Sequence, residues 1–175
     1  MLYKFDGNRP RIGNDTFVAP TALVIGDVVI ADNCYIGHSA IIRGDYGRIE
    51  IGEGTAVEES VVIHAPPGAT HEIGRRVTLG HGAICHGLRI GDMAVIGMGA
   101  ILSINTTIGN GSIVAEGSVV PANTTIADNM VAAGNPAATK REVRDTDRQL
   151  WDFGKQLYID LAKKYLELGM EPVGE

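Results

Sequence analysis

The stretch IGNDTFVAPTALVIGDVVIADNCYIGHSAII, residues 12–42, places an aliphatic side chain at every sixth position. These positions are Ile12, Val18, Val24, Ile30, Ile36 and Ile42. A small side chain such as Ala22, Cys34 or Ala40 usually follows four residues later. Neither the period of an α-helix nor the alternation of a strand produces this spacing. A six-residue repeat instead predicts a β-helix, in which the aliphatic residue fills the coil interior and the small residue fits at the turn.

The repeat continues through most of the chain. It returns at Ile51, Val57, Ile63, Ile73, Leu79, Ile90, Ile96, Leu102, Ile108, Val114, Val120 and Ile126. From the known left-handed form of this architecture we take three hexads per coil, one on each face. We therefore expect a mainly β protein whose residues 1–137 form a left-handed parallel β-helix domain.

A different pattern follows the break at residues 134–136. Apolar side chains then recur three and four residues apart, at Leu150, Phe153, Leu157, Leu161, Tyr165 and Leu168. This spacing predicts an amphipathic C-terminal α-helix within residues 138–175. We expect Asp145 or Thr146 to cap it. Its apolar stripe should pack on the outside of its own solenoid or of a neighbouring subunit's.

Composition narrows the class of protein. The 175 residues suffice for one domain with its own core, and the formal net charge of −6 argues against a nucleic-acid or anionic-membrane partner. The start, MLYKFDGNRP, lacks the apolar run of a signal peptide, and no stretch is apolar enough to span a membrane. Cys34 and Cys85 both fall in positions of the repeat that predict a buried, structural thiol. We expect a cytoplasmic protein.

The repeat is interrupted near four of the five histidines. Three residues are added between Ile42 and Ile51, four between Ile63 and Ile73, and one is missing between Leu79 and Ile90. Insertions in a solenoid occur at corners and often gather on the functional side. The histidines near these interruptions are His64, His71, His81 and His86.

Hexads three apart share a face, so positions convert into a three-dimensional arrangement. His64 and His86 each follow an inward residue of one face and should stack one coil apart, at about 4.8 Å. Arg43 should lie one coil earlier in the same column. His81 belongs to a different face, above Glu58 and Glu59, so it should meet the stacked pair only across a subunit boundary of a three-fold assembly.

Such an interface would hold three imidazoles and leave one coordination position open, which is the arrangement of catalytic zinc sites. Imidazole also suits cobalt and iron, so the ligands alone do not fix the metal. Ordinary surface histidines are the alternative interpretation. We expect His38 and His71 to be solvent-facing or hydrogen-bonded rather than ligands.

Several segments resemble the γ-class carbonic anhydrases and their close homologues. They are RGDYGRI (43–49), VVIH (61–64), TLGHGAICHG (78–87) and IGMGA (96–100), while AGNPA (133–137) is shared more loosely with hexapeptide acyltransferases. The resemblance covers residues 10–137. It implies a homotrimer with a metal, Zn²⁺ or alternatively Fe²⁺ or Co²⁺, at each subunit interface. The ligands implied are His64 and His86 of one subunit and His81 of the next.

The resemblance also implies an activity, namely reversible hydration of CO2 to bicarbonate by a metal-bound hydroxide, a lyase reaction. Arg43 would order the site by pairing with the carboxylates of Asp45 and Glu59. Glu58 and Glu59 stand where the family commonly has Gln-Asp, and we expect Glu58 to position the hydroxide or to accept its proton.

Two further departures from the family pattern predict low activity. The loop APPGAT (65–70) is too short to carry the family's proton-shuttling glutamate, and Tyr46 replaces a second one. Two other functions therefore stay open. One is an acyl-CoA thioesterase or acyltransferase of the hexapeptide superfamily, with Arg75, Arg76 and Arg89 contacting the CoA phosphates. The other is a non-catalytic trimeric assembly protein, in which the metal only locks the subunits together.

Overall fold

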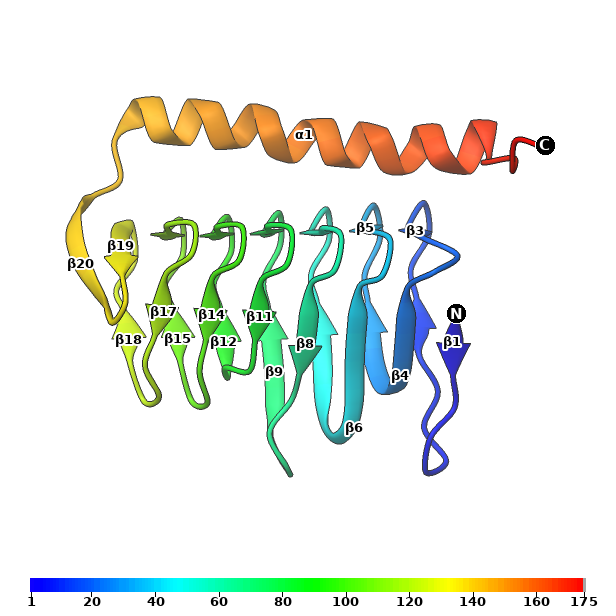
Figure 1. Ribbon diagram of the computed structural model, residues 1–175, viewed down its shortest axis with the longest axis horizontal. Coiled ribbons are helices and arrows are strands. Elements are labelled where there is room, and N and C mark those ends of the chain that lie inside the picture. The colour runs from blue at the N-terminus through cyan, green and yellow to red at the C-terminus, as the bar shows by residue number, and fades with distance from the viewer. Residues whose placement is uncertain (175) are drawn as a thin grey trace.

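The chain folds into a left-handed parallel β-helix with one long α-helix lying along it (Figure 1). The computed structural model describes residues 1–174. A twelve-stranded sheet contains β1 (Leu2–Tyr3), β2 (Arg11–Ile12), β4 (Leu23–Ile30), β6 (Ile41–Ile51), β8 (Val62–His64), β9 (Thr70–Ile73), β11 (Ile84–Cys85), β12 (Arg89–Ile90), β14 (Ile101–Leu102), β15 (Thr107–Ile108), β17 (Val119–Val120) and β18 (Thr125–Ile126). An eight-stranded sheet contains β3 (Phe17–Val18), β5 (Tyr35–Ile36), β7 (Ala56–Val57), β10 (Thr78–Leu79), β13 (Val95–Ile96), β16 (Ile113–Val114), β19 (Met130–Gly134) and β20 (Ala137–Glu142).

The strand register confirms three hexads per coil. Ile63 pairs with Ile42 of the preceding coil and with Cys85 of the following one. On another face, Val57 pairs with Leu79. Cys85 thus occupies an inward position, as the one-residue deletion before Ile90 predicted. The long strands β4 and β6 each run through positions of two faces, and they join those faces into the twelve-stranded sheet.

The core is the column of aliphatic side chains inside the coils. The inward residues Ile42, Ile63, Leu79 and Leu102 are all fully buried. Each coil contributes only one such side chain per face, so the interior is narrow and is filled mainly by Ile, Val and Ala. Cys34 and Cys85 are buried in this core as free thiols, which confirms their predicted structural place.

Two corners of the solenoid are enlarged. β6 continues as a strand through the first insertion, and the second insertion forms the loop between β8 and β9 (Figure 1). Both extend past the neighbouring turns at the same edge of the molecule (Figure 1). The insertions therefore shape one edge and leave the inward column continuous.

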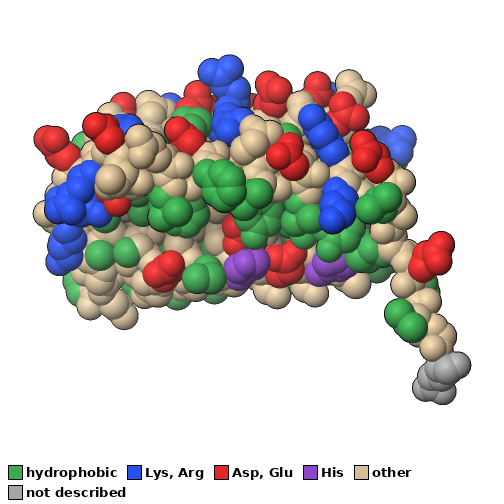
Figure 2. Space-filling model, turned by 90° about the horizontal axis from the view of Figure 1, so that it is seen from above, with side chains coloured by type: hydrophobic (Ala, Val, Ile, Leu, Met, Phe, Trp, Pro, Cys, Tyr) green, Lys and Arg blue, Asp and Glu red, His purple; other side chains and the backbone are tan. Residues whose placement is uncertain are grey.

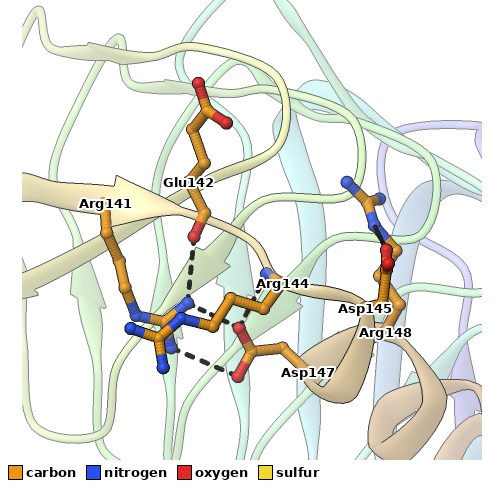
Figure 3. A network of polar contacts seen from close by, with 6 residues as sticks. All are labelled: Arg141, Glu142, Arg144, Asp145, Asp147 and Arg148. Carbon is orange, nitrogen blue, oxygen red and sulfur yellow. Dashed lines mark hydrogen bonds and ion pairs between the residues drawn. The ribbon is translucent and has the colours of Figure 1, made fainter.

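The solenoid ends in an antiparallel pair, β19 with β20, before the helix α1 (Asp145–Leu168) begins. The residues directly after 137 are thus a strand, and the helix starts later than its pattern suggested. The predicted cap, Asp145 or Thr146, is wrong, because the N-cap residue is Arg144. Asp147 serves this end instead: its carboxylate accepts the Arg144 backbone N–H at 2.9 Å and pairs with Arg141 at 3.2 Å (Figure 3).

Helix α1 packs on its own solenoid, which is one of the two positions predicted for it. It contacts β3, β5 and β7 and buries Lys155, Ile159 and Ala162. No helix within residues 1–174 is both long and apolar enough to cross a membrane.

The face of α1 that meets the solenoid matches the expected stripe only in part, since Leu161 and Tyr165 pack against the core and the rest of the stripe does not. Leu150, Phe153 and Leu157 are 66%, 64% and 51% exposed in the single chain. The physical reason is an aromatic cluster, defined as Phe17, Tyr35, Tyr158 and Tyr165. Its rings stack across the junction between α1 and the strands β3 and β5, which fixes the rotation of the helix about its axis.

Candidate metal centre

The predicted column of Arg43, His64 and His86 is present. Arg43 and His64 are register partners on β6 and β8, and His86 follows β11 one coil later. The imidazole rings of His64 and His86 stack with centroids 4.9 Å apart and planes inclined by 24°. The parallel ladder, with its strand spacing, produces this contact directly. The two rings face the same side of the solenoid and can turn nitrogens toward one point.

Asp45 joins the column to its arginine. The Arg43 Nη1 donates to Asp45 Oδ2 at 2.6 Å, and the His64 Nε2 lies 3.0 Å from Asp45 Oδ1. Burial raises the pKa of Asp45, but the hydrogen bonds from Arg43 and His64 outweigh it and the pKa is lowered overall. Asp45 is therefore a carboxylate that orients the His64 ring. Of the two partners predicted for Arg43, only Asp45 contacts it within one chain.

His81 lies in the other half of the site. It follows β10 in the eight-stranded sheet, and its side chain is 46% exposed. Its Nε2 is 3.1 Å from Glu58 Oε2 and its Nδ1 is 2.8 Å from Glu59 Oε2. In the view from above α1, histidine and acidic side chains lie together along one long edge beside a band of hydrophobic ones (Figure 2).

The two carboxylates beside His81 differ in environment. Burial raises the pKa of Glu58, and the nearby His81 opposes that rise. Glu58 also accepts the His81 backbone N–H at 3.0 Å. For Glu59 burial again raises the pKa, but a hydrogen bond from Tyr35 and other contacts lower it overall. Glu59 is thus the better-stabilised carboxylate.

No set of three or more His, Cys, Asp or Glu side chains within residues 1–174 of one chain is arranged to hold a metal. The residues present nevertheless fit a metal divided between subunits. The His86 Nε2 is buried without any hydrogen-bond partner, and buried polar nitrogens are rarely left in that state. Three imidazole nitrogens are a ligand set that zinc commonly takes.

The prediction for His71 is wrong, since this side chain is neither solvent-facing nor hydrogen-bonded. It points inward from β9, is fully buried, and has no hydrogen-bond partner at either ring nitrogen. Burial lowers the pKa of His71 to about 4. The register of β9, in which His71 pairs with Ile49, puts it in the coil interior. The prediction for His38 is confirmed, because its Nδ1 lies 3.0 Å from the Thr21 hydroxyl.

The structure adds residues that the sequence pattern did not single out. Tyr35 donates its hydroxyl hydrogen to Glu59 Oε1 at 2.7 Å. Tyr158 brings its hydroxyl from α1 to Glu58. Burial raises the pKa of Tyr158 most, and the neighbouring Glu58 raises it further. Tyr35 also falls next to an inward residue of the repeat, but its link to Glu59 joins positions 24 residues apart. Helix packing, which the repeat does not encode, decides the Tyr158 contact.

Similarity to known proteins agrees with this fold. Residues 9–44 match the family described as bacterial transferase hexapeptide (six repeats). The carnitine operon protein CaiE of Salmonella agona is 36% identical over 163 residues, which cover 91% of this chain and 81% of that protein. CaiE of Escherichia coli is 35% identical over 160 residues, covering 91% and 82%. The chain belongs to the bacterial hexapeptide-repeat transferase family.

Two solved structures of this family superpose closely on the chain. A hexapeptide transferase family protein from Anaplasma phagocytophilum gives a TM-score of 0.90 at 31% identity, over 94% of this chain and 98% of that one. A suggested acetyltransferase from Bacillus cereus gives 0.90 at 30% identity, over 96% and 98%. Family membership thus fixes the solenoid and leaves the reaction open.

A groove of about 410 Å³ lies beside α1. Arg75, Arg76 and Lys163 line it. Arg76 donates to Gln156 of α1 at 3.3 Å, and Arg75 pairs with Asp92 at 3.4 Å. Arg89 instead lines a different groove, between strands of the twelve-stranded sheet. The three arginines expected near CoA phosphates therefore do not converge.

Proposed function

We propose that this chain is a metal-dependent γ-carbonic anhydrase-like enzyme that converts CO2 and water to bicarbonate, reversibly, as a homotrimer. Each subunit interface would hold one metal, Zn²⁺ or alternatively Fe²⁺ or Co²⁺. The ligands would be His64 and His86 of one subunit and His81 of its neighbour.

The observation that carries the proposal is that one chain holds the three candidate histidines in two groups that do not meet. One group is the His64–His86 stack, in which the His86 Nε2 is buried without a partner. The other is His81, half-exposed on a different face and backed by two carboxylates. A second copy of the chain completes the set, because it supplies the half that each face lacks.

An apolar surface beside the stack supports assembly. Ile84 and Ile101 are register partners on β11 and β14, adjoining His86, and they are 43% and 36% exposed. Apolar side chains on a solenoid face are favourable when another subunit covers them. The ligand column and a surface suited to a partner thus lie on one face.

The chain's own residues would divide the work around this centre. A metal bound there supplies Lewis-acid chemistry that makes water a usable nucleophile near neutral pH. Asp45 orients His64 and is itself held by Arg43. Glu59 holds the Nδ1 side of His81. Glu58 lies beside His81 Nε2, where it can accept a proton or orient the reacting water.

The test is metal content and CO2 hydration of protein purified without added zinc. We expect close to one metal per chain and measurable hydration in stopped-flow pH-indicator assays. His86→Ala should lose the metal and reduce hydration at least about 100-fold, since a three-ligand site does not survive with two. His38→Ala is the matched control, because His38 bonds to Thr21 and should leave both unchanged. Metal-replete protein that hydrates no CO2 between about pH 6 and 9 would overturn the proposal.

An acyl-CoA reaction is the second candidate. It is favoured by the suggested acetyltransferase from Bacillus cereus, which is 30% identical, and by the groove beside α1 that Arg76 and Lys163 line. Acetyl-CoA should then raise the melting temperature of the wild type and not of Arg76→Gln. The wild type should also cleave acetyl-CoA, either with water to acetate and free CoA or with an added amine or alcohol that takes the acetyl group and releases CoA. A trimer that dissociates on chelation but shows neither activity would instead identify a non-catalytic assembly protein.

A further inference from the structure

Tyr35 has an unusual place among the residues near His81. It lies on β5, is 3% exposed, and donates its hydroxyl hydrogen to Glu59 Oε1 at 2.7 Å. Its ring contacts those of Phe17, Tyr158 and Tyr165, with centroids 5.6, 5.2 and 6.2 Å away. These neighbouring rings restrict the orientation of the Tyr35 ring, and in that orientation its hydroxyl contacts Glu59.

Glu59 passes this constraint on to His81. One carboxylate oxygen accepts from Tyr35, and the other lies 2.8 Å from His81 Nδ1. A carboxylate fixed at one oxygen has little freedom to rotate the other. With Nδ1 turned to Glu59, Nε2 is the nitrogen that would face a metal, which would replace its present contact with Glu58 Oε2 at 3.1 Å. Partners of this kind set the tautomer and the ring orientation of metal-binding histidines.

We propose that Tyr35 is a positioning residue for the metal ligand His81, acting through Glu59. The inference rests on the metal site proposed above. It also gives α1 a part in that site, because Tyr158 and Tyr165 of the helix pack against the Tyr35 ring. Tyr35 touches neither the substrate nor the metal, and its effect is on the direction in which the His81 ring points.

The competing role for Tyr35 is simple packing beneath α1. Tyr35→Phe separates the two roles, since it keeps the ring and removes only the hydroxyl. Tyr165→Phe is the matched control: it removes a hydroxyl from the same aromatic cluster, where Tyr165 stacks on Phe17 at 4.5 Å, and leaves the Tyr35–Glu59 bond in place.

Metal binding is the readout. Zinc affinity is measured by competition with a chromophoric chelator, and the visible absorption of the Co²⁺-loaded protein reports ligand geometry. We expect Tyr35→Phe to bind zinc 10–100-fold more weakly, the usual effect of losing a hydrogen bond behind a metal ligand, and to alter the Co²⁺ spectrum. Tyr165→Phe should change neither. Thermal unfolding of the metal-free proteins shows whether the fold is retained.

A double-mutant cycle tests the route through Glu59. In a Glu59→Ala background, Tyr35→Phe should have no further effect on zinc affinity. Wild-type zinc affinity and an unchanged Co²⁺ spectrum in Tyr35→Phe would overturn the inference while leaving the metal site standing. An equal loss with and without Glu59 would also overturn it. A wild type that binds no metal, or whose binding is independent of His81, would overturn the metal site and this inference together.

Discussion

At the residue scale, His71 places a polar side chain in the coil interior without any partner. Both of its ring nitrogens are buried and unbonded, and the residue is fully buried. A buried polar group without a hydrogen bond costs about 1–3 kcal/mol of folding free energy. His71 is thus a local defect in a solenoid whose other inward positions nearby are aliphatic.

His71→Leu should therefore raise the free energy of unfolding by about 1 kcal/mol, because it exchanges an unbonded imidazole for an apolar side chain of similar size. Urea denaturation at pH 7, at fixed protein concentration and with chelator present, measures this. His38→Leu is the control and should have little effect, since His38 is at the surface with Thr21 as partner. Destabilisation of His71→Leu would show that the assembled protein gives the imidazole a partner.

Lys155 is a second buried ionisable residue. It is 2% exposed on the inner face of α1, and its Nζ donates to Thr78 Oγ1 at 3.2 Å and to the Ala94 carbonyl at 3.3 Å. Burial lowers the pKa of Lys155 to about 8, with Arg76 acting in the same direction and Asp152 and Glu58 against it. Folding at neutral pH therefore buries an ammonium that has no carboxylate bonded to it.

This predicts a defined pH dependence of stability. Below about pH 8 both the folded and unfolded chains carry the charge, so the cost of burying it is fully present. Between about pH 8 and the ordinary lysine value near 10.5, the unfolded chain binds more protons, and stability rises with pH. Lys155→Met should be more stable than wild type at pH 7 by about 3 kcal/mol, because each unit of the lowered pKa corresponds to about 1.4 kcal/mol, and this difference should vanish by about pH 10.5. Denaturation of both proteins at pH 7, 9 and 10.5 measures the difference; a pH-independent difference contradicts the interpretation.

At the element scale, α1 can lie close to the solenoid because one turn has no side chain. Gly54 has φ +67°, and a Cβ built on it would lie 3.1 Å from Ile159 Cδ1 and 3.2 Å from Arg76 Cγ. Gly117 has nearly the same backbone, φ +63°, but a Cβ there meets nothing within 4 Å. The two glycines thus share the same conformational requirement and differ only in the helix contact.

Gly54→Ala should consequently destabilise the protein more than Gly117→Ala. Both pay roughly 1–2 kcal/mol for a left-handed alanine, and only Gly54→Ala also crowds Ile159. Thermal unfolding followed by circular dichroism gives the two melting temperatures, and protease sensitivity within residues 145–168 reports helix docking. Equal melting temperatures would mean that α1 shifts aside without cost.

At the scale of the whole molecule, the two halves of the proposed metal site lie on different faces of one rigid solenoid. His64 and His86 belong to the twelve-stranded sheet, and His81 follows a strand of the eight-stranded sheet. A β-helix core packed this tightly does not deform enough to bring separate faces together. Assembly, and not a conformational change of one chain, is the route by which the halves can meet.

Mixed assemblies test this directly. His81→Ala and His64→Ala homotrimers should each lack metal. Mixed trimers of the two should regain about one site, since one kind of interface then contributes His64 and His86 from one subunit and His81 from the other. Metal analysis of mixed trimers separated by two affinity tags measures the recovery. Verified mixed trimers that stay metal-free would exclude ligation across subunits.

The sequence by itself determined the solenoid and, with three hexads per coil taken from the known left-handed form, the stacking of His64 on His86. The reason is that a six-residue period acts on every coil in the same way, so a count along the chain gives the position of a side chain in space. Even the deletion before Ile90 could be counted, and Cys85 took the inward position that the count required. The recurrence of apolar side chains three and four residues apart after residue 145 likewise predicted a helix on the outside of the solenoid.

Only the tertiary structure decided the rotation of α1, the inward place of His71 and the bond from Tyr35 to Glu59. These depend on contacts between residues that no period relates. The stacking of Tyr165 on Phe17 set which helix face meets the solenoid, and the pairing of His71 in strand β9 with Ile49 set His71 in the core. Local repetition therefore fixed the coils, whereas packing between distant segments fixed the surroundings of the histidines.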